Sequence, residues 1–441
     1  MYFMNKLFAI ISDSLIIGYL LIPNLLFSYL FYNHRGLNYY IMPFILFYAL
    51  NKSGLFLLRG LGIINNFFKI VKLGLLSAIL GTILMIINAS SFDNYLIYDG
   101  CAILMGLGLS CYPATYLTIR DQLTTKQKWP LNNSLLLALP LVFLFIVTLK
   151  IFIRNYYSSL IWGFLIYLII IFISLYKLSI LYEKKNKKIF IPHTDEPSNV
   201  IFFILVFLLA ISTKFVIESP HTLLIFIIIT VVISIIFFLH FRKEKPYYSL
   251  LTLWFGGIRS CLIVYTIISY TVMGQYAKAN LAYILFVFSI LLAISILKIF
   301  KLKINVQKCI MMILIISILL LFKRTYLIGL FGITIFGTMG SMKNQKYYMN
   351  DAQIIKNEKR SLRYRYLNIG SIIMQAVVII VLVIVSAICN NNKFIILNDY
   401  AFRNIGYFLY KTLNITIIID WLVIIISGLG LLKFELKHEN N

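Results

Sequence analysis

Two ionisable residues lie inside long apolar stretches of this chain, where a charge is unusual. Asp13 lies in SDSLIIGYLLIP, and Arg259 lies in WFGGIRSCLIVY. A charge at the centre of a bilayer costs at least about 2.5 kcal/mol, so such residues are functional candidates by default. Asp13 could take up a proton, and Arg259 could bind an anionic group or hold Asp13 ionised by pairing with it. The plainer alternatives are a hydrated Asp13 and an Arg259 that caps backbone carbonyl groups.

Three further polar residues lie in apolar surroundings. Lys52, between Asn51 and Ser53, could contact a small molecule or extend its ammonium group to water. Asn133 could bind the same molecule or bridge two helices. Asp420, in TIIIDWLVIII, is expected to form a structural hydrogen bond or to lie in an interface.

Several kinds of chemistry lack their residues. The five cysteines lie in or beside apolar runs without a CxxC pair, so we interpret them as small buried apolar residues. The histidines show no HxxxH or HExxH spacing, and we expect no metal site. No GxxxxGK[ST] motif occurs, which argues against ATP hydrolysis. We therefore expect neither an enzyme nor a bound cofactor.

The composition indicates which elements position these residues. The chain has 441 residues, of which 61% are hydrophobic and 12% charged. Soluble domains are nearer half apolar and a quarter charged. The net charge of +25 does not indicate a nucleic-acid surface, because the basic residues lie between apolar stretches. This distribution is typical of cytoplasmic loops in an integral membrane protein.

Apolar runs of about 20 residues predict spanning helices. Breaks at charged residues and at Asn, Gly or Pro divide the chain into about fourteen such segments. They are 8–32, 38–58, 72–90, 97–118, 131–150, 157–178, 199–217, 221–241, 247–273, 279–298, 307–322, 325–342, 366–389 and 412–432. Two breaks are weak, at Glu218–His221 and at Lys323–Arg324, so a count of twelve also fits.

The basic residues predict the orientation. With the N-terminus in the cytoplasm, inside segments carry roughly three basic residues for each one outside. We therefore expect both termini and the basic stretch 343–365 on the cytoplasmic side of the plasma membrane, the inner membrane in a two-membrane cell.

The segments fall into two similar groups. We expect six helices in 1–182, a basic linker with two extra helices in 183–246, and six helices in 247–441. The helices that begin GCAILMGLGLS at Gly100 and GLFGITIFGTMG at Gly329 look alike and precede basic loops. Internal duplication with a site between the halves is a recurring plan of transporters. Under this plan the helices that carry Asp13 and Arg259 are equivalent, and both residues would line a central cavity.

The segment 97–128 resembles the major facilitator superfamily, and most closely its fourteen-helix drug:proton antiporter branch. The likeness rests on Gly106 and Gly108, on Pro113, and on the pair Arg120–Asp121 ahead of a basic loop. The resemblance implies helix packing at Gly106, Gly108 and Pro113. It also implies a cytoplasmic gate in which Arg120 and Asp121 take part.

Two other segments extend the resemblance, and both depart from the family pattern. Asp13 and Pro23 resemble the Asp and Pro of its first helix, with one residue more between them. Arg59 lies where the family has a gate arginine, but Leu58 replaces the acidic residue before it. The fifth segment lacks the antiporter glycines.

The leading interpretation is a secondary active transporter that works by alternating access. We expect export of a small amphipathic or organic solute with proton coupling, and a lipid bilayer, a small-molecule substrate and protons as partners, without nucleic acid. Asp13, Arg259, Lys52 and Asn133 are the candidate residues for substrate binding or proton coupling. A lipid or lipid-linked oligosaccharide flippase and a membrane scaffold that transports nothing are the alternatives.

Overall fold

The computed structural model describes most of the helical chain. The described residues are 2–34, 40, 42–60, 67–124, scattered positions between 137 and 148, 156–183, 198–215, 222–244, 248–299, 304–351, 354, 358–390 and 410–439. They form helices joined by short turns, and no strand occurs among them. The prediction of an all-helical protein is confirmed.

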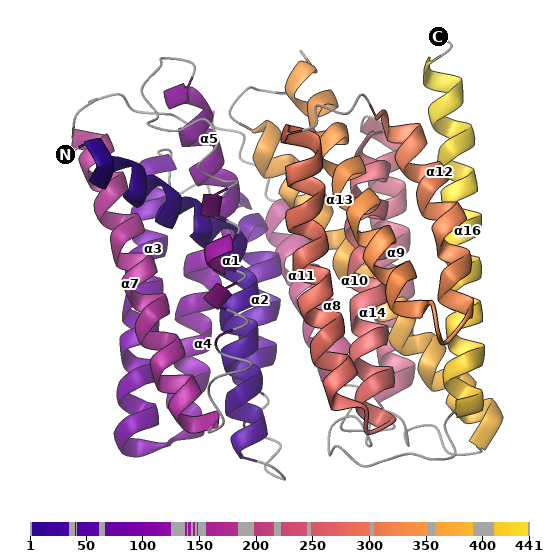
Figure 1. The fold of residues 1–441 in the computed structure, drawn as a ribbon, viewed down its shortest axis with the longest axis horizontal. Helices are drawn as coiled ribbons and strands as arrows, with labels where there is room; N and C mark the ends of the chain where they lie inside the picture. The colour runs from indigo at the N-terminus through magenta and orange to yellow at the C-terminus, as the bar shows by residue number, and fades with distance from the viewer. Residues whose placement is uncertain are drawn as a thin grey trace. The chain divides into compact units, whose positions relative to one another are not determined.

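The chain divides into two compact units, and each is described by itself (Figure 1). Unit 1 comprises Met1–Ile211 and Ile355–Arg365, and unit 2 comprises Ser212–Ile354 and Tyr366–Asn441. The predicted boundaries after 182 and 246 stay a prediction.

Unit 1 contains the early helices. They are α1 (Tyr2–Asn33), α2 (Met42–Gly60), α3 (Phe67–Ile87), the π-helix η2 (Asn88–Phe92), α4 (Tyr95–Ser110), α5 (Tyr112–Thr124) and α7 (Tyr156–Glu183). The helix α8 (Ser198–Phe215) begins in unit 1. Within the unit, α4 packs against α2 and α3, and α1 packs against α7.

Unit 2 contains the later helices. They are α9 (Thr222–Glu244), α10 (Tyr248–Val272), α11 (Tyr276–Ile299), α12 (Val306–Ser317), the 3-10 helix η3 (Ile318–Leu321), α13 (Tyr326–Asn350), most of α14 (Lys359–Asn390), and α16 (Tyr410–Glu439). Here α13 packs against α11 and α12, as α4 packs against α2 and α3 in unit 1.

The helices fit a membrane by length and composition. Among the described residues, seven helices are long and apolar enough to span a bilayer, and five further apolar helices are shorter. The predicted segments overlap helices, except that 131–150 is described only at scattered positions. A membrane-embedded helical protein is therefore supported, while the count of fourteen spans stays a prediction.

Apolar stripes on single helices explain why these helices need lipid. On α3 the exposed side chains are Leu73, Leu76, Leu80, Ile83, Leu84 and Ile87, which recur at helical spacing on one face. The opposite face, with Leu75, Ala78 and Met85, is buried against the unit. An apolar outer stripe of this kind is unfavourable in water and favourable against acyl chains.

Glycines set the close approach of α3 and α4. A Cβ built on Gly108 would meet the carbonyl oxygen of Gly74, and one on Gly74 would meet that of Gly108. A Cβ on Gly106 would lie 3.0 Å from the carbonyl oxygen of Phe47 in α2. Since backbone cannot move aside as a side chain can, all three positions need glycine, as helix pairs in membranes commonly do.

Candidate functional site

A buried ion pair in unit 1 joins two of the residues singled out from the sequence. Nη1 of Arg120 lies 3.3 Å from both carboxylate oxygens of Asp13. The Asp13 side chain is 0% exposed, whereas that of Arg120 is 18% exposed. The carboxylate thus depends on the protein for its stabilisation, while the guanidinium retains contact with its surroundings.

Two buried tyrosines, Tyr112 and Tyr116, lie beside this ion pair. Tyr112 donates its hydroxyl hydrogen to the carbonyl oxygen of Ser12, the residue before Asp13, at 3.0 Å. The rings of Tyr112 and Tyr116 stack with their centroids 5.1 Å apart, and both side chains are 1% exposed. Aromatic surroundings exclude water and strengthen the attraction between the two charges.

A break in the fourth predicted span positions Arg120. The helix stops at Ser110 and resumes as α5 at Tyr112, with Cys111 between them. Pro113 has no amide hydrogen, so it suits the first turn of a new helix. The carbonyl oxygen of Cys111 accepts hydrogen bonds from both the amide and the hydroxyl of Thr115, at 3.1 and 2.6 Å, which anchors the start of α5. Arg120 follows two turns later.

Arg259 makes different contacts in unit 2. Its Nε donates to the carbonyl oxygen of Phe255 at 3.0 Å, and its Nη1 donates to Oγ1 of Thr338 in α13 at 3.2 Å. Its aliphatic stem passes Gly337, where a Cβ would lie 3.3 Å away. The bond to Phe255 resembles the carbonyl cap that was one expectation for Arg259. The carboxylate of Asp13, which was another partner considered for Arg259, pairs with Arg120.

Lys52 is buried, at 7% exposure, and its Nζ lies 5.7 Å from the centroid of the Tyr48 ring. The extension to water that the sequence allowed is not seen. Arg59 belongs to α2 and Asp121 to α5, but their side chains lie outside the described part of the structure. Asn133 lies outside the described residues altogether.

Asp420 lacks the hydrogen bond expected for it. The residue is 2% exposed in α16, and within the described part of the chain neither carboxylate oxygen has a hydrogen-bond partner. The expectation assumed that a buried acid finds a donor, but the nearby hydroxyl of Tyr265 donates to the carbonyl oxygen of Leu413 instead.

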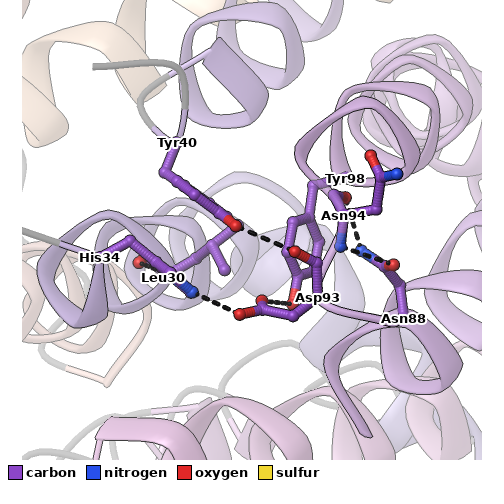
Figure 2. A network of polar contacts seen from close by, with 7 residues as sticks. All are labelled: Leu30, His34, Tyr40, Asn88, Asp93, Asn94 and Tyr98. Atoms are coloured by element: carbon purple, nitrogen blue, oxygen red, sulfur yellow. Dashed lines mark hydrogen bonds and ion pairs between the residues drawn. The ribbon is translucent and has the colours of Figure 1, made fainter. Parts of the chain in front are cut away.

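A second polar cluster in unit 1 was not anticipated. Figure 2 shows His34, just after α1, pointing its ring at Asp93, which lies between η2 and α4. Nε2 of His34 lies 2.8 Å from Oδ2 of Asp93, and the hydroxyl of Tyr98 donates to Oδ1 at 2.9 Å. Tyr40 stacks on His34 with centroids 3.8 Å apart and donates to the carbonyl oxygen of Asp93.

Backbone conformation and the contacts of both ring nitrogens fit this cluster. Asp93 has φ 50° and ψ 41°, a left-handed conformation that Asp tolerates better than most residues. Nδ1 of His34 lies 3.0 Å from the carbonyl oxygen of Leu30, so both ring nitrogens face acceptors. The sequence predicted a break between residues 90 and 97, and Asn94 caps α4 within it, but nothing in the sequence linked this break to His34.

The two clusters are well separated along α1: Asp13 lies about a third of the way into the helix, and His34 lies just after its end. Asp13 and His34 are 21 residues apart in sequence, which corresponds to about 30 Å along a helix. Pro23 lies between them inside α1. Unit 1 therefore carries one buried ion pair about a third of the way along α1 and one partly exposed polar cluster just after the end of that helix.

Comparisons with known proteins identify the fold. No family model matches the chain, and no curated protein matches it. Solved structures do: a peptide transporter POT in complex with sulfate has a TM-score of 0.58 and 13% identity, covering 99% of this chain and 94% of that one. A POT family transporter in complex with a thioalcohol conjugated peptide has a TM-score of 0.58, 14% identity, and coverage of 98% and 96%.

A third solved structure, an auto inhibited POT family peptide transporter, has a TM-score of 0.54 and 12% identity, and the match covers 97% of this chain and 96% of that one. Over nearly its whole length the chain thus has the fold of these transporters, which belong to the major facilitator superfamily. The expected fold is thus found in this chain, and its apolar helices agree with an integral membrane protein. The drug:proton antiporter branch is not confirmed, because these neighbours are peptide transporters.

Proposed function

We propose that this chain is a secondary active transporter that couples the movement of short peptides to protons by alternating access. The observation that carries the proposal is the match to peptide transporters over more than nine-tenths of both chains. Asp13 and Arg120 support it independently, because a buried acid–base pair at membrane depth is the kind of group that couples protons to transport.

Proton coupling follows from the electrostatics of that pair. A proton on Asp13 neutralises the carboxylate and removes its attraction for Arg120. The guanidinium then seeks another anion, and the terminal carboxylate of a peptide matches its fork of donors. When the peptide leaves, Arg120 returns to Asp13 and favours loss of the proton. Proton and peptide are thereby bound in the same step of the cycle.

The other candidate residues have roles in the same proposal. Arg259, Lys52 and Asn133 remain the further candidates for contact with the substrate or for proton coupling. Arg59, Arg120 and Asp121 form the cytoplasmic gate. The shared packing order, α4 on α2 and α3, and α13 on α11 and α12, supports two repeated halves.

The test is uptake of labelled dialanine into liposomes that contain the purified protein, with an acidic exterior. We expect accumulation above equilibrium, abolished by a protonophore and competed by unlabelled dipeptides but not by free alanine. Asp13→Asn should keep exchange of labelled for unlabelled peptide and lose accumulation. Uptake that does not depend on the pH gradient contradicts the proposal. So does the absence of uptake in liposomes that contain folded protein.

The same vesicles test export of an amphipathic solute, which the antiporter resemblance led us to expect. An amphipathic cationic dye replaces the peptide, and proton-driven movement of the dye with no movement of dialanine would select that branch.

A further inference from the structure

Asp420 is a buried acid that the proposed mechanism leaves without a role. It lies ten residues into α16, about 15 Å from the start of the helix. Its side chain is 2% exposed, and in the described part of the structure no donor reaches either oxygen. An ionised carboxylate in such surroundings costs several kcal/mol unless a cation or donors compensate it.

The face of α16 that carries Asp420 is turned toward α10. Leu413, Asp420 and Ser427 follow one another at intervals of seven residues and therefore share a face of the helix. The hydroxyl of Tyr265 donates to the carbonyl oxygen of Leu413 at 2.8 Å, and Nε1 of Trp254 donates to Oγ of Ser427 at 2.9 Å. These two hydrogen bonds fix α16 against α10 on either side of Asp420.

The groups that face Asp420 cannot compensate a negative charge. On α10, Cys261 and Tyr265 interact with it electrostatically, and neither is a cation. Tyr265 already donates its hydroxyl hydrogen to Leu413. Arg259, two residues from Cys261 and so on another face of α10, directs its described bonds to Phe255 and Thr338.

Among the described residues, the other elements that contact α16 show no cation beside Asp420. The helix α13, which carries Lys343 and Lys346, reaches α16 at Glu435 through Tyr347, fifteen residues from Asp420. On α12 the titratable residues are Lys308 and Cys309, close to its N-terminus, and η3 has none. Beside Asp420, α16 contacts the opposite end of α12, where Nε1 of Trp421 donates to Oγ of Ser317 at 3.1 Å. Within the described part of the chain, the groups known to interact with Asp420 are therefore uncharged, and neither of its oxygens receives a hydrogen bond.

We propose that Asp420 is a proton-binding site in unit 2, which takes up and releases a proton during each transport cycle. A proton neutralises the carboxylate without further ligands, whereas a metal cation such as Na⁺ needs several oxygen atoms around it. Because hydrogen bonds hold α16 to α10 on both sides, release of the proton requires the two helices to part or water to enter. The site therefore links the proton to movement of α16. The coupling role rests on the proposed function.

Infrared difference spectroscopy tests the site itself, without transport. In the purified protein, a carboxyl C=O stretching band should disappear as the pH is raised, and Asp420→Asn should lack it. Glu435→Gln is the matched control: Glu435 lies on the same helix at 1% exposure but accepts a hydrogen bond from Tyr347 at 3.1 Å. This variant should keep the band. A band unaffected by Asp420→Asn overturns the proposal, as does a band removed by Na⁺ at constant pH.

Liposome assays test the coupling role. Asparagine resembles the protonated acid in shape, so Asp420→Asn should fold, retain exchange of labelled for unlabelled dialanine, and lose accumulation driven by the pH gradient. Glu435→Gln should retain both. Normal gradient-driven accumulation by Asp420→Asn overturns the coupling role. If the wild-type protein neither exchanges nor accumulates peptide, the proposed function fails, and with it the coupling role, whereas the infrared result still decides whether Asp420 binds a proton.

Discussion

Asp13 and Arg120 are unequal partners, and this inequality has a measurable consequence. The acid is fully buried, while the arginine side chain is 18% exposed. Loss of the arginine leaves the charged carboxylate of Asp13 buried without its partner. Loss of the acid leaves an arginine that can turn toward its surroundings.

We therefore expect Arg120→Gln to destabilise the protein by about 3 kcal/mol and Asp13→Asn by about 1 kcal/mol. The double variant should be more stable than Arg120→Gln alone, because no charge is then left unpaired. Thermal unfolding in detergent measures all three. Equal effects of the two single variants that simply add in the double variant would argue against a direct pair.

At the residue scale the sequence indicated which side chains matter but not how they pair. Asp13 was conspicuous because a charge interrupts an apolar run, and Arg120 because it ends one. Their pairing joins positions 107 residues apart, and only the packing of α1 beside α5 brings them together. The cluster of His34 and Asp93 escaped notice because both residues lie between apolar runs, where polar side chains are ordinary.

Helix positions follow from the sequence more directly than helix contacts do. The length of an apolar run sets where a span begins and ends, and the described helices overlap the predicted segments. The break at Cys111 was not predicted, although Pro113 was named, because a proline tolerated in the first turn of a helix looks the same in sequence as one inside a kinked helix. Whether the shorter helices cross the bilayer also depends on tilt and packing, which hydropathy does not encode.

Glycines at two positions of α4 should respond oppositely to one added methyl group. In Gly108→Ala the new Cβ meets the backbone of Gly74, so we expect a loss of about 1–3 kcal/mol. In Gly100→Ala nothing lies within 4 Å of the new Cβ, and lower backbone entropy in the unfolded chain should stabilise the helix by about 0.5–1 kcal/mol. Unfolding temperatures of the two variants provide the test. Equal shifts would mean that α3 and α4 do not pack closely at Gly108.

For the whole molecule, the distribution of basic residues leads us to propose cytoplasmic termini in a plasma membrane. Four of the five cysteines are buried and Cys389 is partly exposed, so Cys389→Ser gives a background for labelling. In intact cells an impermeant maleimide should label Ser91→Cys, at the exposed turn after α3, and leave Lys346→Cys unlabelled until the membrane is opened. Labelling of Lys346→Cys from outside would reverse the orientation.

The two-part organisation was visible in the sequence as similar glycine-rich helices, and both of these helices occupy the same position in their packing order. What the sequence did not provide is the kind of solute. Substrate choice depends on side chains that converge from many helices, and motif residues near the loops say little about it.

Because the helix breaks at Cys111, a rotation of α5 about the break moves the guanidinium group of Arg120. Nine residues separate Cys111 from Arg120, which is about 13 Å of helix, so a swing of about 15° at the break displaces the guanidinium group by about 3 Å. That distance is comparable with the 3.3 Å between the charged groups. The ions can therefore be parted by a small rotation of α5 alone, while α4 stays seated on its glycine contacts.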